Sequence, residues 1–265
     1  MNARLRKDDP AAALRRCRVA LARRGATPIS EATGGGAVEE GRHYPAGEVY
    51  DPASHAQYFF HRHPGGERTR GGIAAEYGHF HLFLRGDGMP PGIAPLLLPE
   101  LAVANAPAAR QSAPLKRGSR DELCHLVAIA VDARGEPVRL FTTNRWVTGE
   151  TWYAADDAIR MLDCFRLPSD HPAALLNQWL VALVRLFQPE IAALLRQRDK
   201  AVMEWRWRRR SSVYEDPRLE ITSNLKIDLD SRLAAGDAAS AETAPAARAS
   251  RRDGGLPSMA EGWGA

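Results

Sequence analysis

Two His-X-His pairs, His61/His63 and His79/His81, lie in aromatic and apolar runs within residues 58–84. Runs of this composition predict β-strands. Because side chains two residues apart in a strand face the same side, each pair points both imidazoles at one surface of a sheet. If the two strands are neighbours, the four imidazoles converge on one point.

Four converging imidazoles indicate a divalent metal site. Neutral imidazole suits Zn, Fe, Ni and Cu, and a carboxylate beside two or three histidines is typical of a site that stays open to water or substrate. Glu76 lies three residues before His79, and Glu67 lies four after His63. We therefore expect Zn, Fe or Mn on the four histidines, with Glu76 or Glu67 as a further ligand or as the general base.

The histidines also have a structural interpretation, in which the rings pack within strands and bond to the backbone or to one another. The chain is then a non-catalytic ligand-binding or interaction protein. Six of the eight histidines fall within residues 43–81, which favours the metal site. In that case we expect a metal-dependent enzyme, and both hydrolysis and oxygenation stay open because the ligand set does not choose between them.

A second polar cluster combines Asn144, Arg145 and Trp146 with Glu150 and Trp152, just past a predicted strand. Loops at strand ends often carry function, so Arg145 is a candidate catalytic residue that anchors a small anionic substrate. The alternative is that the tryptophans anchor the following helix and Arg145 pairs with an acid, which is the commoner role of such an arginine.

Nucleic acid is not an expected partner, although Trp205-Arg-Trp207-Arg-Arg-Arg210 combines aromatic rings with cations. The run also fits a helix end whose cations lie near the negative pole of the helix dipole. The net charge of +4 comes from basic residues spread along the chain, and only four of them are lysines. An excess of arginine and alanine is typical of a GC-rich genome, so the charge does not indicate a polyanion partner.

Secondary-structure patterns predict an α+β fold, with a mainly antiparallel sheet in a partial barrel or sandwich and C-terminal helices packed on one face. In chain order we expect a helix over residues 10–24, a linker to residue 36 and strands at the two histidine runs. A hairpin follows within residues 123–146, with its turn at 132–135. We then expect helices over 151–165 and 172–210, the second with a break near Pro189, and a last strand within 219–229. Residues 86–120 are rich in Pro and Ala, and we expect either a short helix at residues 99–105 or a covering arm.

These patterns divide the chain into a helix and linker (1–36), one α+β domain (37–232) and a disordered tail (233–265). No apolar run reaches the roughly 20 residues of a membrane span, and charges interrupt the N-terminus, so we expect neither a membrane partner nor a signal peptide. The three cysteines are far apart in the sequence and match no disulfide framework, which favours the reducing cytoplasm.

Resemblances to known families add three expectations. The run His61-Arg-His63-Pro-Gly-Gly-Glu67 resembles the first metal motif of the cupin barrels, which implies two histidines and a glutamate on iron or another divalent ion. The run His79-Phe-His81-Leu looks like the start of the histidine-triad motif of nucleotide hydrolases and transferases, although Phe83 stands at the third alternate position. From HYPAGEVYDP to RLFQPEIAALL, over residues 10–232, the chain is most similar to an uncharacterised bacterial family catalogued as a domain of unknown function.

Overall fold

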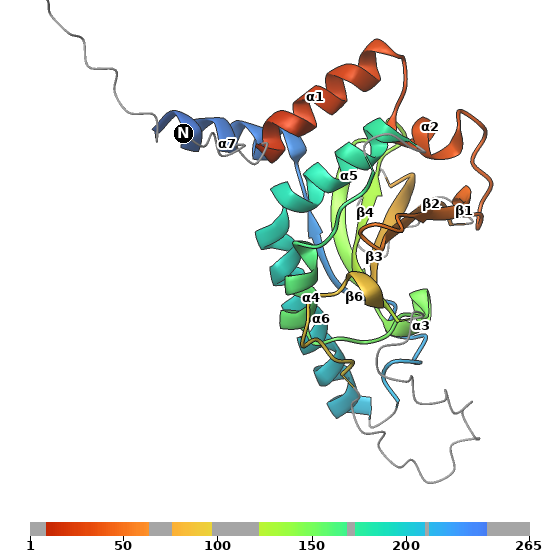
Figure 1. Cartoon of the computed structure of the whole chain (residues 1–265). Helices are drawn as coiled ribbons and strands as arrows, with labels where there is room; N and C mark the ends of the chain where they lie inside the picture. Colours follow the sequence, from red (N-terminus) through yellow and green to blue (C-terminus); the bar gives the residue numbers. More distant parts are fainter. Residues whose placement is uncertain (1–8, 64–75, 97–121, 169–172, 210–211, 243–265) are drawn as a thin grey trace, which may run out of the picture.

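A six-stranded antiparallel sheet forms the centre of the protein (Figure 1). The computed structural model describes residues 9–63, 76–96, 122–168, 173–209 and 212–242. The strands lie side by side in chain order: β1 (Tyr44–Tyr50), β2 (Ala56–His61), β3 (Gly78–Arg85), β4 (Leu123–Val131), β5 (Pro137–Thr143) and β6 (Ile221–Lys226). The sheet is open, with β1 and β6 at its edges.

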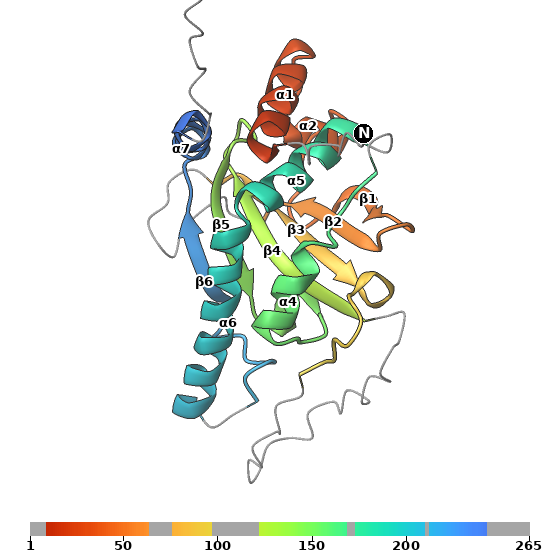
Figure 2. The ribbon, with the colours of Figure 1, turned by 60° about the vertical axis from the view of Figure 1, so that its left-hand side comes forward.

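Helices α4, α5 and α6 lie on one face of this sheet, as Figure 2 shows. The helices are α1 (Pro10–Arg23), α2 (Pro28–Thr33), α3 (Arg145–Thr148), α4 (Ala155–Leu162), α5 (Ala174–Leu186), α6 (Gln188–Arg209) and α7 (Leu229–Glu242), with a 3-10 turn η1 (Gly86–Gly88). The predicted α+β class and the placement of the C-terminal helices are confirmed.

Strand alternation sorts the sheet residues into two faces. Tyr58, Phe60, Phe80 and Leu82 are fully buried in the main hydrophobic core. The ring of Phe80 lies 5.9 Å from that of Trp179 on α5, so this face packs against the helices. The intervening residues, which include the histidines, point to the opposite face because successive strand residues alternate.

The predicted helix break is observed where α5 meets α6. Gln188 and Pro189 begin α6 directly after Phe187, and the two helix axes meet at an angle of 72°. Proline suits a first helical turn because its missing N–H has no partner there. Among the described residues, no single helix combines the length and apolar character of a membrane span, and only α5 and α6 taken together reach that threshold.

Two predicted boundaries need correction, and a third prediction is not tested. The predicted linker contains α2, which Thr27 caps through its hydroxyl on the Ser30 N–H and which buries Ile29 in the main core. The helix expected over residues 151–165 is shorter, since α4 begins at Ala155. The helix expected at residues 99–105 lies outside the described residues.

The predicted disordered tail begins within a helix. Helix α7 starts four residues before residue 233 and continues to Glu242. Asp228 caps it by accepting a hydrogen bond from the Ser231 N–H, and Leu229 and Leu233 are buried in the main core. An alanine-rich segment therefore becomes helical where its first turns carry two apolar residues at i and i+4 spacing.

Candidate metal centre

The two histidine runs form neighbouring strands, as the sequence predicts. Strands β2 and β3 pair antiparallel with His61 opposite His79 and Phe59 opposite His81. On the next strand, Ala130 lies opposite His79. Ala130 is fully buried in a small cluster with Ala128 and Phe141, and the Phe141 ring lies 5.2 Å from the His79 ring.

Three histidines form a group that can hold a metal ion: His61, His63 and His79. One ring nitrogen from each lies within 4.8 Å of the other two. The Nε2 atoms of His61 and His79 are 2.7 Å apart, a hydrogen-bond distance. Tetrahedral zinc with Zn–N bonds of about 2.0–2.1 Å separates its nitrogens by about 3.3 Å, a spacing that lies between the 2.7 Å of this pair and the 4.8 Å limit for the group.

His63 gives the group its access to solvent. It follows the end of β2 and is exposed, whereas His61 is half-buried and His79 is buried. The His63 ring lies 4.6 Å from the His61 ring and 5.2 Å from the His79 ring, between centroids. A metal ion held here is therefore reachable from the side of His63.

The fourth predicted ligand, His81, has a different partner. Its Nδ1 lies 3.0 Å from Nε2 of His125, and Nδ1 of His125 lies 3.3 Å from the Thr143 hydroxyl. The His81 ring still lies 4.8 Å from the His79 ring, so it stands directly beside the three ligands. His125 is not among the histidines that the sequence singles out. It lies in an apolar strand run, and only the pairing of β3 with β4 brings its ring to His81.

Burial keeps these imidazoles neutral. Loss of solvation lowers the pKa of His61 to about 3, and the neighbouring His63 and His43 add to the effect. Burial likewise lowers the pKa of His125 to about 3 and holds the pKa of His79 and of His81 well below its ordinary value. At neutral pH each of these rings therefore has one nitrogen with a lone pair that can bind a metal and one N–H.

Glu76 is beside the centre, but its carboxylate is already paired. It forms a two-pronged ion pair with Arg139 of β5, in which Arg139 Nη2 donates to Glu76 Oε2 over 2.6 Å and Arg139 Nε donates to Glu76 Oε1. Both side chains are only about a tenth exposed. Glu76, one of the two predicted candidates for the general base, therefore has Arg139 as its partner. The other candidate, Glu67, lies outside the described residues.

Arg145 lies beyond the end of β5, away from the row of His79. Helix α3 follows the end of β5, and the residue of β5 in the His79 row is Arg139. From Arg139 to Thr143 the strand advances about 13 Å toward the other end of the sheet. Arg145 Nη1 pairs with the carboxylate of Glu215, which is the structural role given above as the alternative.

The tryptophans of this second cluster also have structural contacts. Trp146 donates its indole N–H to the Leu219 carbonyl at 2.9 Å, and Trp152 packs against Tyr214 with ring centroids 5.0 Å apart. In the basic run at the end of α6, Trp205 donates to Asp216 at 2.9 Å, whereas Trp207 is exposed. The cluster therefore joins three parts of the chain: α3, α6 and the segment that precedes β6.

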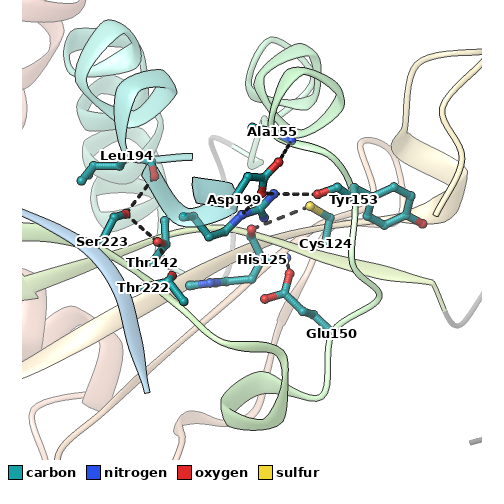
Figure 3. Close-up of polar contacts among 11 residues, drawn as sticks. Cys124, His125, Thr142, Glu150, Tyr153, Ala155, Leu194, Asp199, Thr222 and Ser223 are labelled. Carbon is teal, nitrogen blue, oxygen red and sulfur yellow. Dashed lines mark hydrogen bonds and ion pairs between the residues drawn. The ribbon is translucent and has the colours of Figure 1, made fainter. Parts of the chain in front are cut away.

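A buried polar network lies at the junction of β4 with the helices (Figure 3). The His125 N–H donates to Glu150 Oε2 at 2.8 Å, and Asp199 of α6 accepts from the Ala155 N–H at 2.6 Å. Burial raises the pKa of Glu150 to about 7, although the nearby Arg198 opposes the shift. The Glu150 carboxylate thus holds the backbone of β4 at His125, and Asp199 joins α6 to the start of α4.

A family model described as a domain of unknown function (DUF6969) matches residues 8–227 of the chain. No curated protein and no solved structure shows a significant match. The likeness to cupins is not supported, because the six strands form an open sheet and not a closed barrel.

Proposed function

The chain belongs to the family described as a domain of unknown function (DUF6969), and from its own geometry we propose that it is a metal-dependent enzyme with a three-histidine centre. The observation that carries the proposal is the convergence of His61, His63 and His79, with one ligand nitrogen of each within 4.8 Å of the others. Structural metal sites are usually closed by four protein ligands, whereas three ligands leave a position for water or substrate.

Hydrolysis fits this centre better than oxygenation. Non-haem iron oxygenases use two histidines and a carboxylate, whereas the group here is three histidines; Glu76 is paired with Arg139 and Glu48 with His43. His61, His63 and His79 would hold the ion as neutral ligands, and the chemistry that it would supply is activation of water at neutral pH. The rings of Phe59 and Phe141 lie beside this group, 5.4 Å from the His61 ring and 5.2 Å from the His79 ring between centroids.

A second candidate function follows from the bonds between the histidines themselves. His61 with His79, and His81 with His125, already lie at hydrogen-bond distance. Such pairs satisfy buried imidazoles without an ion. In this case the protein is a ligand-binding or interaction protein, and the histidines stabilise the sheet.

Metal content separates the two functions. Tag-free protein is analysed for bound metals and then titrated with Co²⁺, whose visible absorption reports tetrahedral nitrogen ligation. The variant is His63→Ala, because His63 is exposed and its loss leaves the core intact. The matched control is His55→Ala, which removes an imidazole bonded to Tyr50 in the β1–β2 turn.

We expect about one equivalent of metal in the parent and in the control. Loss of a direct ligand weakens binding by more than the about 10–100-fold that follows loss of an outer partner. Absence of Co²⁺ binding in the parent, or equal affinity in His63→Ala, contradicts the metal centre and leaves the histidine network.

A further inference from the structure

Arg139 is the cation nearest to the candidate metal centre in the sheet row that contains His79. We infer that the substrate is a small oxyanion, a carboxylate or phosphate compound, whose charged group binds Arg139 while a second polar group reaches the metal position. This inference rests on the proposed function, since it names the substrate class of the same site. It also replaces Arg145, which the sequence suggested, with a different anchor.

The first support is the charge balance of the centre. His61, His63 and His79 are neutral ligands, so a divalent ion held by them keeps its full charge of +2. Two described acids lie near this face: Glu76, whose charge is balanced by Arg139, and Glu48, which bonds His43 and Gln57. Neither belongs to the group of three histidines that could hold the ion. A half-buried uncompensated charge is costly, and an anionic substrate removes that cost.

The second support is the position of Arg139. The sheet register places His79 opposite Ala130 and Ala130 opposite Arg139, so only an alanine separates the imidazole from the arginine. Phe141 links them, because its ring lies 5.2 Å from the His79 ring and the Arg139 Cζ lies 4.3 Å over it. Arg139 is therefore within about 10 Å of His79, the spacing of two strand intervals.

The third support is how Glu76 holds the guanidinium. Glu76 binds Arg139 through Nε and Nη2, which leaves donors on Nη1 and fixes the plane of the group. A planar guanidinium recognises carboxylate and phosphate oxygens with two parallel hydrogen bonds. Lys226, opposite Arg139 on the edge strand β6, adds a second cation to the same row.

Glu76 thus has a dual effect on an incoming oxyanion. It orients Arg139, but its own charge competes for the same guanidinium. Neutralising Glu76 is therefore expected to strengthen anion binding, whereas a purely structural ion pair gives no such gain. This opposite sign for the two partners of one ion pair is the basis of the test.

The test measures binding of inorganic phosphate and of acetate by isothermal titration calorimetry, with metal-free and Co²⁺-loaded protein at constant chloride. The variants are Glu76→Gln and the double variant Glu76→Gln/Arg139→Gln, which removes both charges and so leaves no unpaired acid in the partly buried pair. The matched control is Arg134→Gln, an exposed arginine in the β4–β5 turn. Circular dichroism checks that each variant folds.

We expect Glu76→Gln to bind the anions at least about 3-fold more tightly than the parent. The double variant should lose about 10–100-fold relative to Glu76→Gln, the value of a charge-assisted hydrogen bond. Arg134→Gln should match the parent. Tighter binding of phosphate than of acetate assigns a phosphate substrate, and the reverse assigns a carboxylate.

Equal anion affinity in the parent, Glu76→Gln and the double variant overturns the inference even if Co²⁺ binds normally. If Co²⁺ does not bind, the proposed function fails, and the metal-free titrations decide the anion site. In that case, phosphate binding that needs Arg139 supports the anion site, and its absence overturns it.

Discussion

The buried His125 should make the metal-free protein less stable in acid, and replacing it should remove a defined part of that dependence. Burial lowers the pKa of this imidazole from 6.5 to about 3. In the unfolded chain the ring takes up a proton below pH 6.5, whereas in the folded protein it stays neutral to about pH 3. The unfolded state therefore binds more protons in this window, and the free energy of unfolding falls as the pH falls.

The magnitude follows from the two pKa values. Each pH unit between them costs up to about 1.4 kcal/mol per group, so His125 contributes a loss of about 2 kcal/mol between pH 7.5 and 5.0. The other buried histidines act in the same direction. Glu150 acts in the opposite direction, because its pKa is raised to about 7 and protonation in acid stabilises the folded form. These contributions are common to parent and variant, so they cancel in the difference.

The assay is urea unfolding of the parent and of His125→Gln at several pH values in this range, with EDTA present. Between pH 7.5 and 5.0, the unfolding free energy of the parent should fall by about 2 kcal/mol more than that of His125→Gln. His55→Gln serves as the control, since this ring lies at the surface beside Tyr50. A constant difference between parent and His125→Gln across the range would refute the argument that the folded protein keeps this imidazole neutral.

Two further variants test the placement of other residues. Gly78→Ala should lower the free energy of unfolding by about 1–3 kcal/mol, measured by urea unfolding. The reason is that the added Cβ would lie 2.6 Å from the Phe60 ring and 2.7 Å from the His61 carbonyl oxygen. An unchanged free energy of unfolding would show that β2 and β3 are less closely packed. Arg145→Ala should cost less than about 1 kcal/mol and leave the affinity for Co²⁺ unchanged, because Arg145 pairs with the exposed Glu215 and lies beyond the end of β5, away from the row of His79. A marked loss of metal affinity would contradict this separation.

Much of the secondary structure could be predicted from local patterns. The β4–β5 hairpin follows from an apolar run, a turn at residues 132–135 and an alternating return, and the structure places the strands there. Helices α5 and α6 follow from apolar residues at helical spacing and a proline between them. Helix α2 was missed because six residues are too few to show a period, and its burial depends on contacts with distant segments.

The candidate site was predicted in part. His-X-His spacing in a strand determines that both rings of a pair face one side, so the sequence was sufficient to propose that the imidazoles converge. It could not identify His125, because only the pairing of β3 with β4 brings that ring to His81. Nor could it point to Arg139, because only the pairing of β4 with β5 places that arginine in the row of His79.

The sequence by itself determined the strand alternation, the helix break at Pro189 and the clustering of histidines, because these depend on residues close together in the chain. Tertiary structure decided which polar groups pair. It joined Glu76 to Arg139 and Arg145 to Glu215 across long stretches of chain, and it placed one arginine beside the imidazoles and the other at the far end of the sheet. The physical reason is that strand pairing fixes register between distant segments, and a charge takes whichever opposite charge that register brings within reach.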